Sequence, residues 1–270
     1  MNATEILSAP IRALLESVAR VSESMWHKGW AEANGGNLSI DITGQMDASL
    51  PPAGDVVPLE TPRPAIGGRC FLITGSGRRF RDLPRNPEQA ACILRVEDNG
   101  AGWRLLWGGC GKAFRPTSEL PTHLALHESL RLHRPDRNVV LHTHPTELIA
   151  LSHLRAFGDE DLLNRTLLGT MPEVKVLAPR GVGLVPYNLP GSEALATATR
   201  AVFERGRDVA LWEMHGCLAT GADIESVFDI IDTVNKGAHI TLLCLAAGQP
   251  PKGLSPAQLD ELTTAFKLEA

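Results

Sequence analysis

Apolar and polar side chains recur with two different spacings along the chain, and the spacing predicts which segments are helices and which are strands. In residues 11–25 the apolar positions lie three or four apart, which predicts a helix that buries one face. The segment Asn37–Ile40 instead alternates polar and apolar residues, as a half-buried strand does. Further strands are expected at 70–73, 92–96 and 103–107, the last two as a hairpin with Asn99-Gly100 in its turn.

The same two spacings alternate through the second half of the chain. A helix is expected over 119–133, with Thr117 or Ser118 as its cap, followed by a strand over 138–144 and a helix over 147–154. The pattern then predicts short strands at 174–177 and 183–186, a helix at 192–205, a strand at 208–215, and helices at 224–245 and 256–266. Hairpins beside helical crossovers predict an α/β fold, in which a mixed sheet carries helices on its faces.

The segment Thr43–Gly68 is rich in proline, which excludes a central strand or a helix interior, so it is expected to be an irregular functional or interface loop. The remaining sequence contains neither an internal repeat nor an interdomain linker. We therefore expect one domain over residues 1–270, with an N-terminal helical segment at about 1–30 and the proline-rich loop at about 43–68.

Composition and charge narrow the class of protein. The 270 residues are 43% hydrophobic with a formal net charge of -5, which is typical of a globular protein and argues against a nucleic-acid partner. No apolar run is long enough to span a membrane, and the N-terminus lacks the pattern of a signal peptide, so a cytoplasmic protein is expected. The basic cluster Arg78, Arg79, Arg81 and Arg85 is interpreted as a solvated loop or subunit contact, with a phosphate clamp as the alternative. The five cysteines contain no CxxC pair, which argues against a disulfide framework or a thiolate zinc site.

The strongest chemical signal is His142-Thr143-His144, in a predicted strand. Residues two apart on a strand point the same way, so both imidazoles could bind one divalent metal such as zinc, although such a pair can equally serve hydrogen bonds. His215, at the end of another predicted strand and before Gly216, is the candidate third ligand. Three neutral nitrogens would leave the metal an open coordination position, as in a catalytic site.

Two other histidine patterns compete with this interpretation. His123 and His127 lie four apart on a predicted helix, but without the Glu of an HExxH motif they are expected to form a partly exposed helix face. The run from His142 through His144 to Glu147 is similar to the ligand run of a cupin-type β-barrel. That fold would need the strand to continue after His144, where the pattern is helical.

A carboxylate and two glycine loops could complete such a site. Glu119 stands at a helix start, where it could either stabilise the helix dipole or face the metal and exchange a proton with substrate. The loops 34–37 and 74–77 combine glycine with Asn, Ser or Thr, so their backbone amides could converge on a phosphate, although each could also be an ordinary turn. The Gly-Ser-Gly run lacks the third glycine of a dinucleotide fingerprint.

Taken in order, the motifs NGGNLS, LITGSG, PTSELPTH, VVLHTHPTELIAL, an acidic Glu173 and WEMHG make the chain resemble the class II aldolase/adducin family over about 24–245. The resemblance implies a three-layer α/β/α sandwich around a mixed, mostly antiparallel sheet, assembled as a homotetramer. It also implies a small-molecule sugar phosphate as substrate and one Zn²⁺ per subunit.

Site roles follow from the same resemblance, position by position. His142, His144 and His215 match the zinc ligands, and Glu119 matches the carboxylate that takes and returns the C3 proton of dihydroxyacetone phosphate. Glu173 matches an acidic residue that members supply to the neighbouring subunit's site. The residues that match the substrate-phosphate loops are Asn34, Asn37, Ser76, Gly77, Thr117 and Ser118.

The implied reaction is reversible retro-aldol cleavage. The proline-rich insertion, the TGSG-R-x-F-R stretch, the DNGAGWRLLWG hairpin and GVGLVPYNLPG are similar to members that convert L-rhamnulose 1-phosphate to dihydroxyacetone phosphate and L-lactaldehyde. Alternatives within the family are cleavage of L-fuculose phosphate, epimerisation or dehydration of another sugar phosphate, and the non-catalytic adducin branch, which is expected to lose the histidines and the carboxylate. From another class, zinc with three histidines and a nearby Glu could activate water in a hydrolase.

Overall fold

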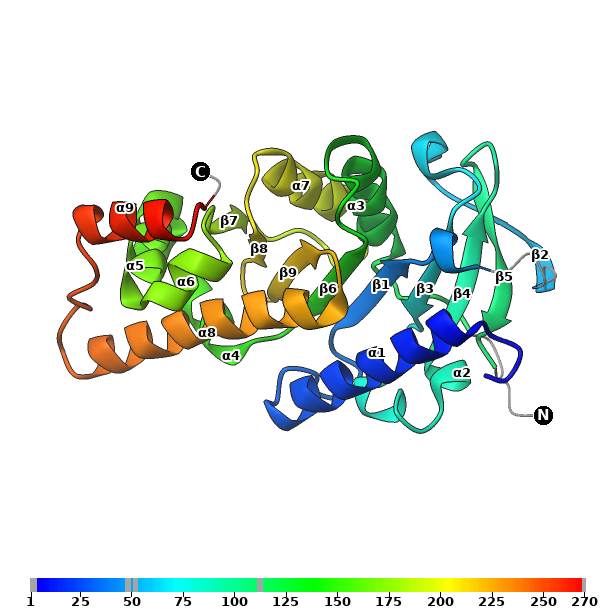
Figure 1. Cartoon of the computed structure of the whole chain (residues 1–270), viewed down its shortest axis with the longest axis horizontal. Helices are drawn as coiled ribbons and strands as arrows, with labels where there is room; N and C mark the ends of the chain where they lie inside the picture. The colour runs from blue at the N-terminus through cyan, green and yellow to red at the C-terminus, as the bar shows by residue number, and fades with distance from the viewer. Residues whose placement is uncertain (1–3, 47–49, 51–52, 111–113, 269–270) are drawn as a thin grey trace.

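The computed structural model describes residues 4–46, 50, 53–110 and 114–268, and its centre is a nine-stranded sheet (Figure 1). The strands are β1 (Asn37–Asp41), β2 (Ala53–Pro58), β3 (Cys70–Thr74), β4 (Ala91–Val96), β5 (Gly102–Gly108), β6 (Val139–Thr143), β7 (Val182–Val185), β8 (Val209–Trp212) and β9 (Gly216–Gly221). Their order is β2-β5-β4-β3-β1-β6-β9-β8-β7, and every neighbouring pair is antiparallel except β7 and β8. The expectation of a mixed, mostly antiparallel sheet is confirmed.

Two contiguous stretches of chain meet in the middle of this sheet. Residues 37–108 supply the five strands on one side, and residues 139–221 supply the four on the other. The join is the antiparallel pair β1–β6, in which Asn37 lies opposite His142. A candidate phosphate-loop residue and a candidate metal ligand are therefore neighbours across the join.

Helices cover both faces of the sheet and complete the three layers (Figure 1). They are α1 (Ala9–His27), α2 (Pro87–Ala90), α3 (Leu120–His133), α4 (Thr146–Ser152), α5 (Glu160–Thr170), α6 (Pro172–Leu177), α7 (Glu193–Glu204), α8 (Ile224–Ala246) and α9 (Pro256–Ala265). Apolar residues of α1, α4, α5, α6 and α8 form one core against the sheet, whereas α3 and α7 pack on the opposite face. The predicted α/β/α sandwich is confirmed.

The apolar and polar residues that alternate along strand β1 face opposite sides of the sheet. Leu38 and Ile40 join the core on the face covered by α1 and α8. Asn37 and Ser39 point to the other face, where α3 covers them. Both faces of β1 are thus buried, rather than one, because a helix with polar side chains matches the polar face of the strand.

The proline-rich segment is more ordered than expected, because it contains the strand β2. This strand pairs only with β5 at the edge of the sheet, where a proline such as Pro58 removes no ladder hydrogen bond from a second neighbour. Farther along, the buried Arg63 forms ion pairs of 2.7 Å with Glu193 and 3.5 Å with Glu128, which tie the segment to α7 and α3.

Three local predictions are wrong. Residues 174–177 belong to the helix α6, whose start is favoured by Pro172, although their β-branched content is typical of a strand. The strand expected over 208–215 ends at Trp212, and a second strand, β9, follows after a turn. Helix α3 has Glu119 at its N-cap without a side-chain capping bond, and the Thr117 hydroxyl accepts from the amide of Glu119 itself, at 3.2 Å, which lies before the first residue of the helix.

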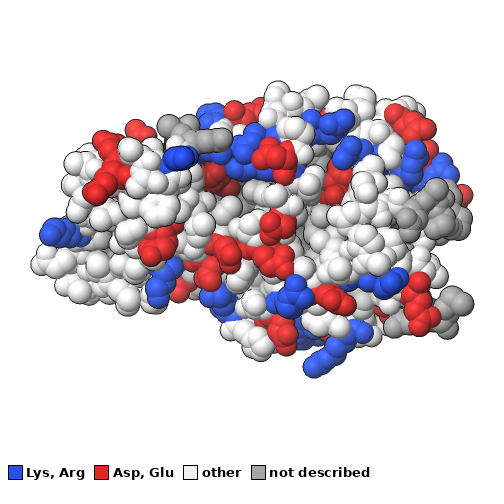
Figure 2. Space-filling view, in the orientation of Figure 1, with Lys and Arg blue, Asp and Glu red and all other residues white. Residues whose placement is uncertain are grey.

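Acidic and basic side chains are interspersed on the face of the molecule drawn in Figure 2. They do not gather there into one surface of a single sign. Among the described residues, no helix is both long enough and apolar enough to cross a bilayer.

Candidate active site

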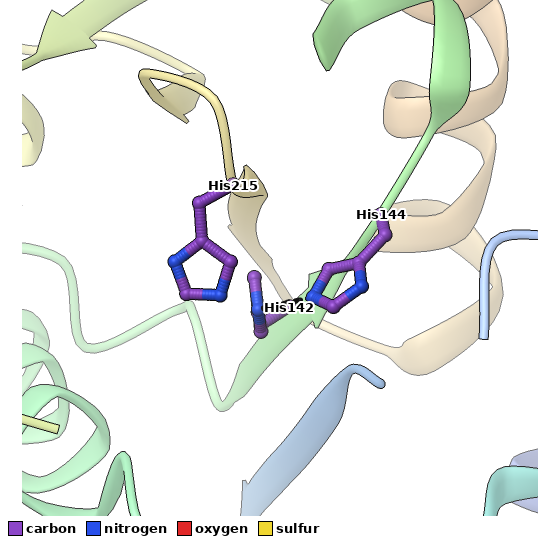
Figure 3. A group of neighbouring side chains, drawn as sticks. All are labelled: His142, His144 and His215. Carbon is purple, nitrogen blue, oxygen red and sulfur yellow. Dashed lines mark hydrogen bonds between the residues drawn. The ribbon is translucent and has the colours of Figure 1, made fainter. Parts of the chain in front are cut away.

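Three histidines converge beside the C-terminal end of β6 (Figure 3). His142 lies on β6, His144 directly follows it, and His215 stands in the turn that leads into β9. One ring nitrogen from each lies within 4.8 Å of the others, and the two Nε2 atoms of His142 and His144 are 3.2 Å apart. The two-residue spacing on a strand has brought the imidazoles together as predicted.

The ring of His142 is fixed on two sides. Its Nδ1 is 2.9 Å from the carbonyl oxygen of Cys217, an acceptor, so Nδ1 carries the hydrogen and the Nε2 lone pair faces the other histidines. The Trp212 ring packs against it with centroids 4.5 Å apart. Burial holds the pKa of His142 well below its ordinary value, which keeps the ring neutral and able to bind a metal.

His144 is oriented by a carboxylate that the sequence analysis did not identify. Glu32 accepts a hydrogen bond from His144 Nδ1 at 2.7 Å, which leaves Nε2 for a metal. Glu32 lies just before the glycine loop 34–37, and its position in the sequence gave no signal of this contact. Carboxylates that accept from a ligating histidine fix the ring and raise its basicity as a ligand.

His215 is reached by a strained turn rather than by the end of a strand. Met214 has a positive φ of 58°, and its amide donates to the Ser152 hydroxyl at 2.8 Å. Burial, with a smaller contribution from His144, lowers the pKa of His215 to about 4. The ring is therefore neutral at physiological pH, like that of His142.

Two glycines leave room for the ligands. A Cβ added to Gly216 would lie 2.6 Å from the carbonyl oxygen of Thr143, 2.8 Å from His144 and 2.9 Å from His142. A Cβ added to Gly35 would lie 2.8 Å from His144 Nδ1. Any larger residue at either position would push a ligand out of place.

The donor set fits a divalent metal of the zinc type. Three imidazoles within reach of one point are the ligands that a catalytic zinc site uses, and they leave a coordination position open. The cupin-type alternative is excluded, because α4 begins at Thr146 and Glu147 bonds to Asn235 and His239 on α8 instead.

Glu119 is the acidic group of this site. It is only 4% exposed, and its Oε1 lies 3.8 Å from His215 Nε2. Its other oxygen, Oε2, is buried and has no hydrogen-bond partner among the described residues. Burial raises the pKa of Glu119 to about 8. Of the two roles open from the sequence, the carboxylate does not cap α3 but faces the histidines.

A cleft of about 220 Å³ opens over the histidines and Glu119. All six candidate phosphate-loop residues line it: Asn34, Asn37, Ser76, Gly77, Thr117 and Ser118. Backbone hydrogen bonds hold the contributing loops together, with Ser76 donating to Arg115 at 2.8 Å and Thr117 donating to Thr74 at 2.8 Å. The structure thus brings these residues, the three histidines and Glu119 into one cleft.

Glu173 is the sequence candidate that lies elsewhere. It stands exposed in the first turn of α6 and does not line the cleft of its own chain. The basic cluster also lies outside the cleft lining. Two of its members stack on aromatic rings. The guanidinium carbon of Arg78 lies 5.6 Å from the centroid of the Phe114 ring, and that of Arg81 lies 4.6 Å from the centroid of the Trp26 ring.

The expectation that His123 and His127 form a partly exposed helix face is wrong. Both are buried, His123 completely, and both bond to the Ser39 hydroxyl on β1. Burial lowers the pKa of His123 to about 3 and that of His127 to about 4. They contact the polar face of β1 instead of solvent.

Comparison with known proteins agrees with this fold. The model of the family described as Class II Aldolase and Adducin N-terminal domain matches residues 16–242. The chain belongs to the class II aldolase and adducin family.

Individual proteins within this class are also similar to the chain. The chain is 37% identical over 257 residues to the rhamnulose-1-phosphate aldolase of Bacteroides thetaiotaomicron, covering 94% of each chain. It is 32% identical over 260 residues to the protein of that name from Escherichia coli O1:K1, covering 93% of each. Its fold is similar to the crystal structure of a sugar-phosphate aldolase from Thermotoga maritima, with a TM-score of 0.79, 30% identity, and coverage of 90% of this chain and 99% of the other.

Proposed function

We propose that this protein is a zinc-dependent aldolase that reversibly cleaves L-rhamnulose 1-phosphate to dihydroxyacetone phosphate and L-lactaldehyde. The observation that carries the proposal is the position of Glu119, a buried carboxylate whose Oε2 has no partner among the described residues, in a cleft lined also by the three histidines and the glycine loops. The curated relatives named rhamnulose-1-phosphate aldolase support the choice of sugar.

His142, His144 and His215 would hold one Zn²⁺ per subunit, with Glu32 and the Cys217 carbonyl orienting two of the rings. A bound zinc ion supplies a Lewis acid that stabilises negative charge on substrate oxygens. No lysine lines the cleft within the described structure, and a metal site provides the charge stabilisation that a Schiff-base lysine would otherwise give.

The phosphate group of the substrate would lie against Asn34, Asn37, Ser76, Gly77, Thr117 and Ser118. These residues offer backbone amides, carboxamides and hydroxyls, and among the described lining residues none is arginine or lysine. Uncharged donors that converge from loops form an anion nest. Holding the phosphate there fixes the position of the carbon chain relative to Glu119.

Glu119 would move the proton. In the direction of synthesis its carboxylate removes a proton from C3 of dihydroxyacetone phosphate, and in cleavage it returns that proton to C3. A carboxylate with a pKa raised by burial is a stronger base than an exposed one, and Oε2 is free to receive the proton. The nearby cationic metal would favour the ionised form that acts as the base.

We further propose that the enzyme is a cytoplasmic homotetramer and that residues 1–270 form one domain. The continuous sheet supports one domain, and the described cysteines, which are all unpaired, agree with a reducing compartment. Large apolar side chains are exposed next to the cleft, at Tyr187, Leu189 and Met214. A neighbouring subunit that covers them could bring its own Glu173 to the site.

The test is release of dihydroxyacetone phosphate from L-rhamnulose 1-phosphate by the purified enzyme, by the same enzyme after chelation, and after zinc is restored. Release that disappears with chelator and returns with Zn²⁺ is the expected result. A folded, zinc-loaded sample without release would contradict the proposal. L-fuculose 1-phosphate tests the closest alternative, and liberation of inorganic phosphate without triose phosphate would indicate a hydrolase.

A further inference from the structure

Helix α3 and strand β1 are joined by a buried row of polar side chains that begins at the cleft. His123 Nε2 bonds to Oδ1 of Asn37, which lines the cleft. The Ser39 hydroxyl lies 2.6 Å from His123 Nδ1 and 2.7 Å from His127 Nε2. His123 and His127 lie four residues apart on one face of α3, and Glu119 is the N-cap residue four positions before His123.

The chemistry of the four groups allows the direction of each hydrogen bond to be worked out. A carboxamide oxygen only accepts, so His123 Nε2 carries a hydrogen. Burial lowers the pKa of His123 to about 3, so the ring is neutral and its Nδ1 must accept from the Ser39 hydroxyl. Having donated its single hydrogen, Ser39 can only accept from His127, whose Nε2 therefore carries a hydrogen.

We propose that His123 is a positioning residue, supported through Ser39 by His127, that holds the Asn37 carboxamide with its oxygen inward and its NH₂ group toward the cleft. There the amide donates to an anionic oxygen of the ligand, which the proposed function identifies as the substrate phosphate. The inference rests on that proposed function only for the identity of the ligand.

The opposite set of hydrogen-bond directions would also give every side chain in the row a partner. If Asn37 pointed its NH₂ group at His123, every hydrogen bond in the row would reverse, and a carbonyl oxygen would face the cleft and repel a phosphate. The geometry of the row favours the first arrangement, because the Asn37 atom that faces His123 Nε2 is the carboxamide oxygen Oδ1. The two arrangements predict opposite tautomers for both histidines.

Nitrogen-15 NMR of histidine-labelled protein at pH 7 distinguishes these tautomers without any assay of activity. His123 and His127 are expected as neutral rings with the hydrogen on Nε2, each assigned by the loss of its signals in a His123→Gln or His127→Gln variant. A hydrogen on Nδ1 of both rings, or a charged His123, would overturn the proposal.

Binding measurements test the consequence for the ligand. His123→Leu removes the donor to Asn37 and should weaken inorganic phosphate binding and raise the KM for the sugar phosphate by about tenfold, the effect of one lost charge-assisted hydrogen bond. Zinc content should not change. His123→Gln, which retains an N–H donor, should recover part of the affinity, and Asn37→Asp should abolish phosphate binding, because its second oxygen would face the anion.

The matched control is Thr122→Val, the neighbouring position on α3. Its hydroxyl is buried without a partner among the described residues, so its loss should leave phosphate affinity and KM unchanged. If His123→Leu does not fold, the His123→Gln variant and the NMR spectrum still decide the question.

The two proposals fail in different ways. Zinc-dependent cleavage by the wild type, with phosphate affinity and KM unaffected by His123→Leu, would overturn the positioning role and leave the aldolase intact. Phosphate binding that depends on His123, in a protein that cleaves no ketose 1-phosphate, would support the positioning role and reject the aldolase.

Discussion

Oε1 of Glu119 lies 3.8 Å from Nε2 of His215, while Oε2 of the same carboxylate is buried without a hydrogen-bond partner in the described part of the chain. A buried carboxylate oxygen without a partner costs stability, more than a neutral hydroxyl does, so its retention at this cleft calls for a functional explanation. Here it is the atom that can accept a proton from a substrate in the cleft.

Glu119→Gln should therefore lower kcat for cleavage by about 10²- to 10⁴-fold, the usual contribution of a positioned general base. Zinc content should stay near that of the wild type, because the histidines supply the ligands. Steady-state kinetics and metal analysis on the same preparation give both values. Glu119→Asp keeps the carboxylate on a shorter side chain, so its kcat should lie between that of the wild type and that of Glu119→Gln. Activity of Glu119→Gln within a few-fold of wild type would remove the carboxylate from the mechanism.

Substitution of Gly216 tests how tightly the ligands are packed. In Gly216→Ala the new methyl would meet the Thr143 carbonyl oxygen at 2.6 Å, so the backbone must shift and take the histidines with it. We expect metal affinity and melting temperature both to fall. Gly158→Ala is the control, since nothing lies within 4 Å of its Cβ and its φ is not positive. Equal zinc affinity in the two variants would show that the ligand geometry tolerates movement.

Glu32→Gln removes the charged acceptor from His144 Nδ1. Groups that orient a ligating histidine in this way typically contribute 10- to 100-fold to metal affinity, and we expect a loss of about tenfold here because the Glu32 side chain is 62% exposed. Competition with a fluorescent zinc chelator measures the affinity directly. The surface variant Glu225→Gln, whose ion pair with Arg20 is also exposed, should leave it unchanged. Identical affinities for both variants would contradict the role of Glu32.

The buried histidines of α3 predict a dependence of stability on pH. The pKa of His127 is about 4 in the folded protein against an ordinary value of 6.5, so between these values the unfolded chain binds a proton that the folded chain does not. Stability is therefore fully present above pH 6.5 and is lost as pH falls toward 4. The slope is up to about 1.4 kcal/mol per pH unit for each such histidine.

Urea unfolding of metal-free wild type and His127→Asn between pH 7.5 and 5.5 would measure this effect. Subtracting the two curves cancels the contribution of the metal ligands, which are common to both. The wild type should lose stability more steeply than the variant as pH falls. Parallel curves would mean that His127 does not remain neutral in the folded protein.

Elements with a strong period were predictable from the sequence, and so was the cluster of histidines. The spacing of apolar residues in α1 and α8 and the β-branched run at the start of β6 leave little choice of structure, and the convergence of His142 and His144 follows from their two-residue spacing along the strand. His215 could be connected to them only as a candidate, because the turn that brings it there depends on a positive φ at Met214.

Other features depend on tertiary contacts that the local pattern does not contain. The β-branched residues of α6 resemble a strand, but packing against α5 and α8 makes them helical. His123 and His127 look like a polar helix face until β1 presents Asn37 and Ser39 opposite them. Glu32 reaches His144 across 112 positions of sequence, and only the folded chain brings the two together.

The pairing of β1 with β6 has a consequence for how the enzyme would lose its site on local unfolding. Residues before the join carry the glycine loops 34–37 and 74–77 but none of the three histidines, and residues after it carry the histidines but neither loop. A local opening that parts these two strands would dismantle the site, and it would also divide the apolar core that Leu38 and Ile40 share with Val139 and Leu141. Opening at the join therefore costs apolar contacts as well as ladder hydrogen bonds, and a substrate or metal bound by residues of both stretches would stabilise the closed form.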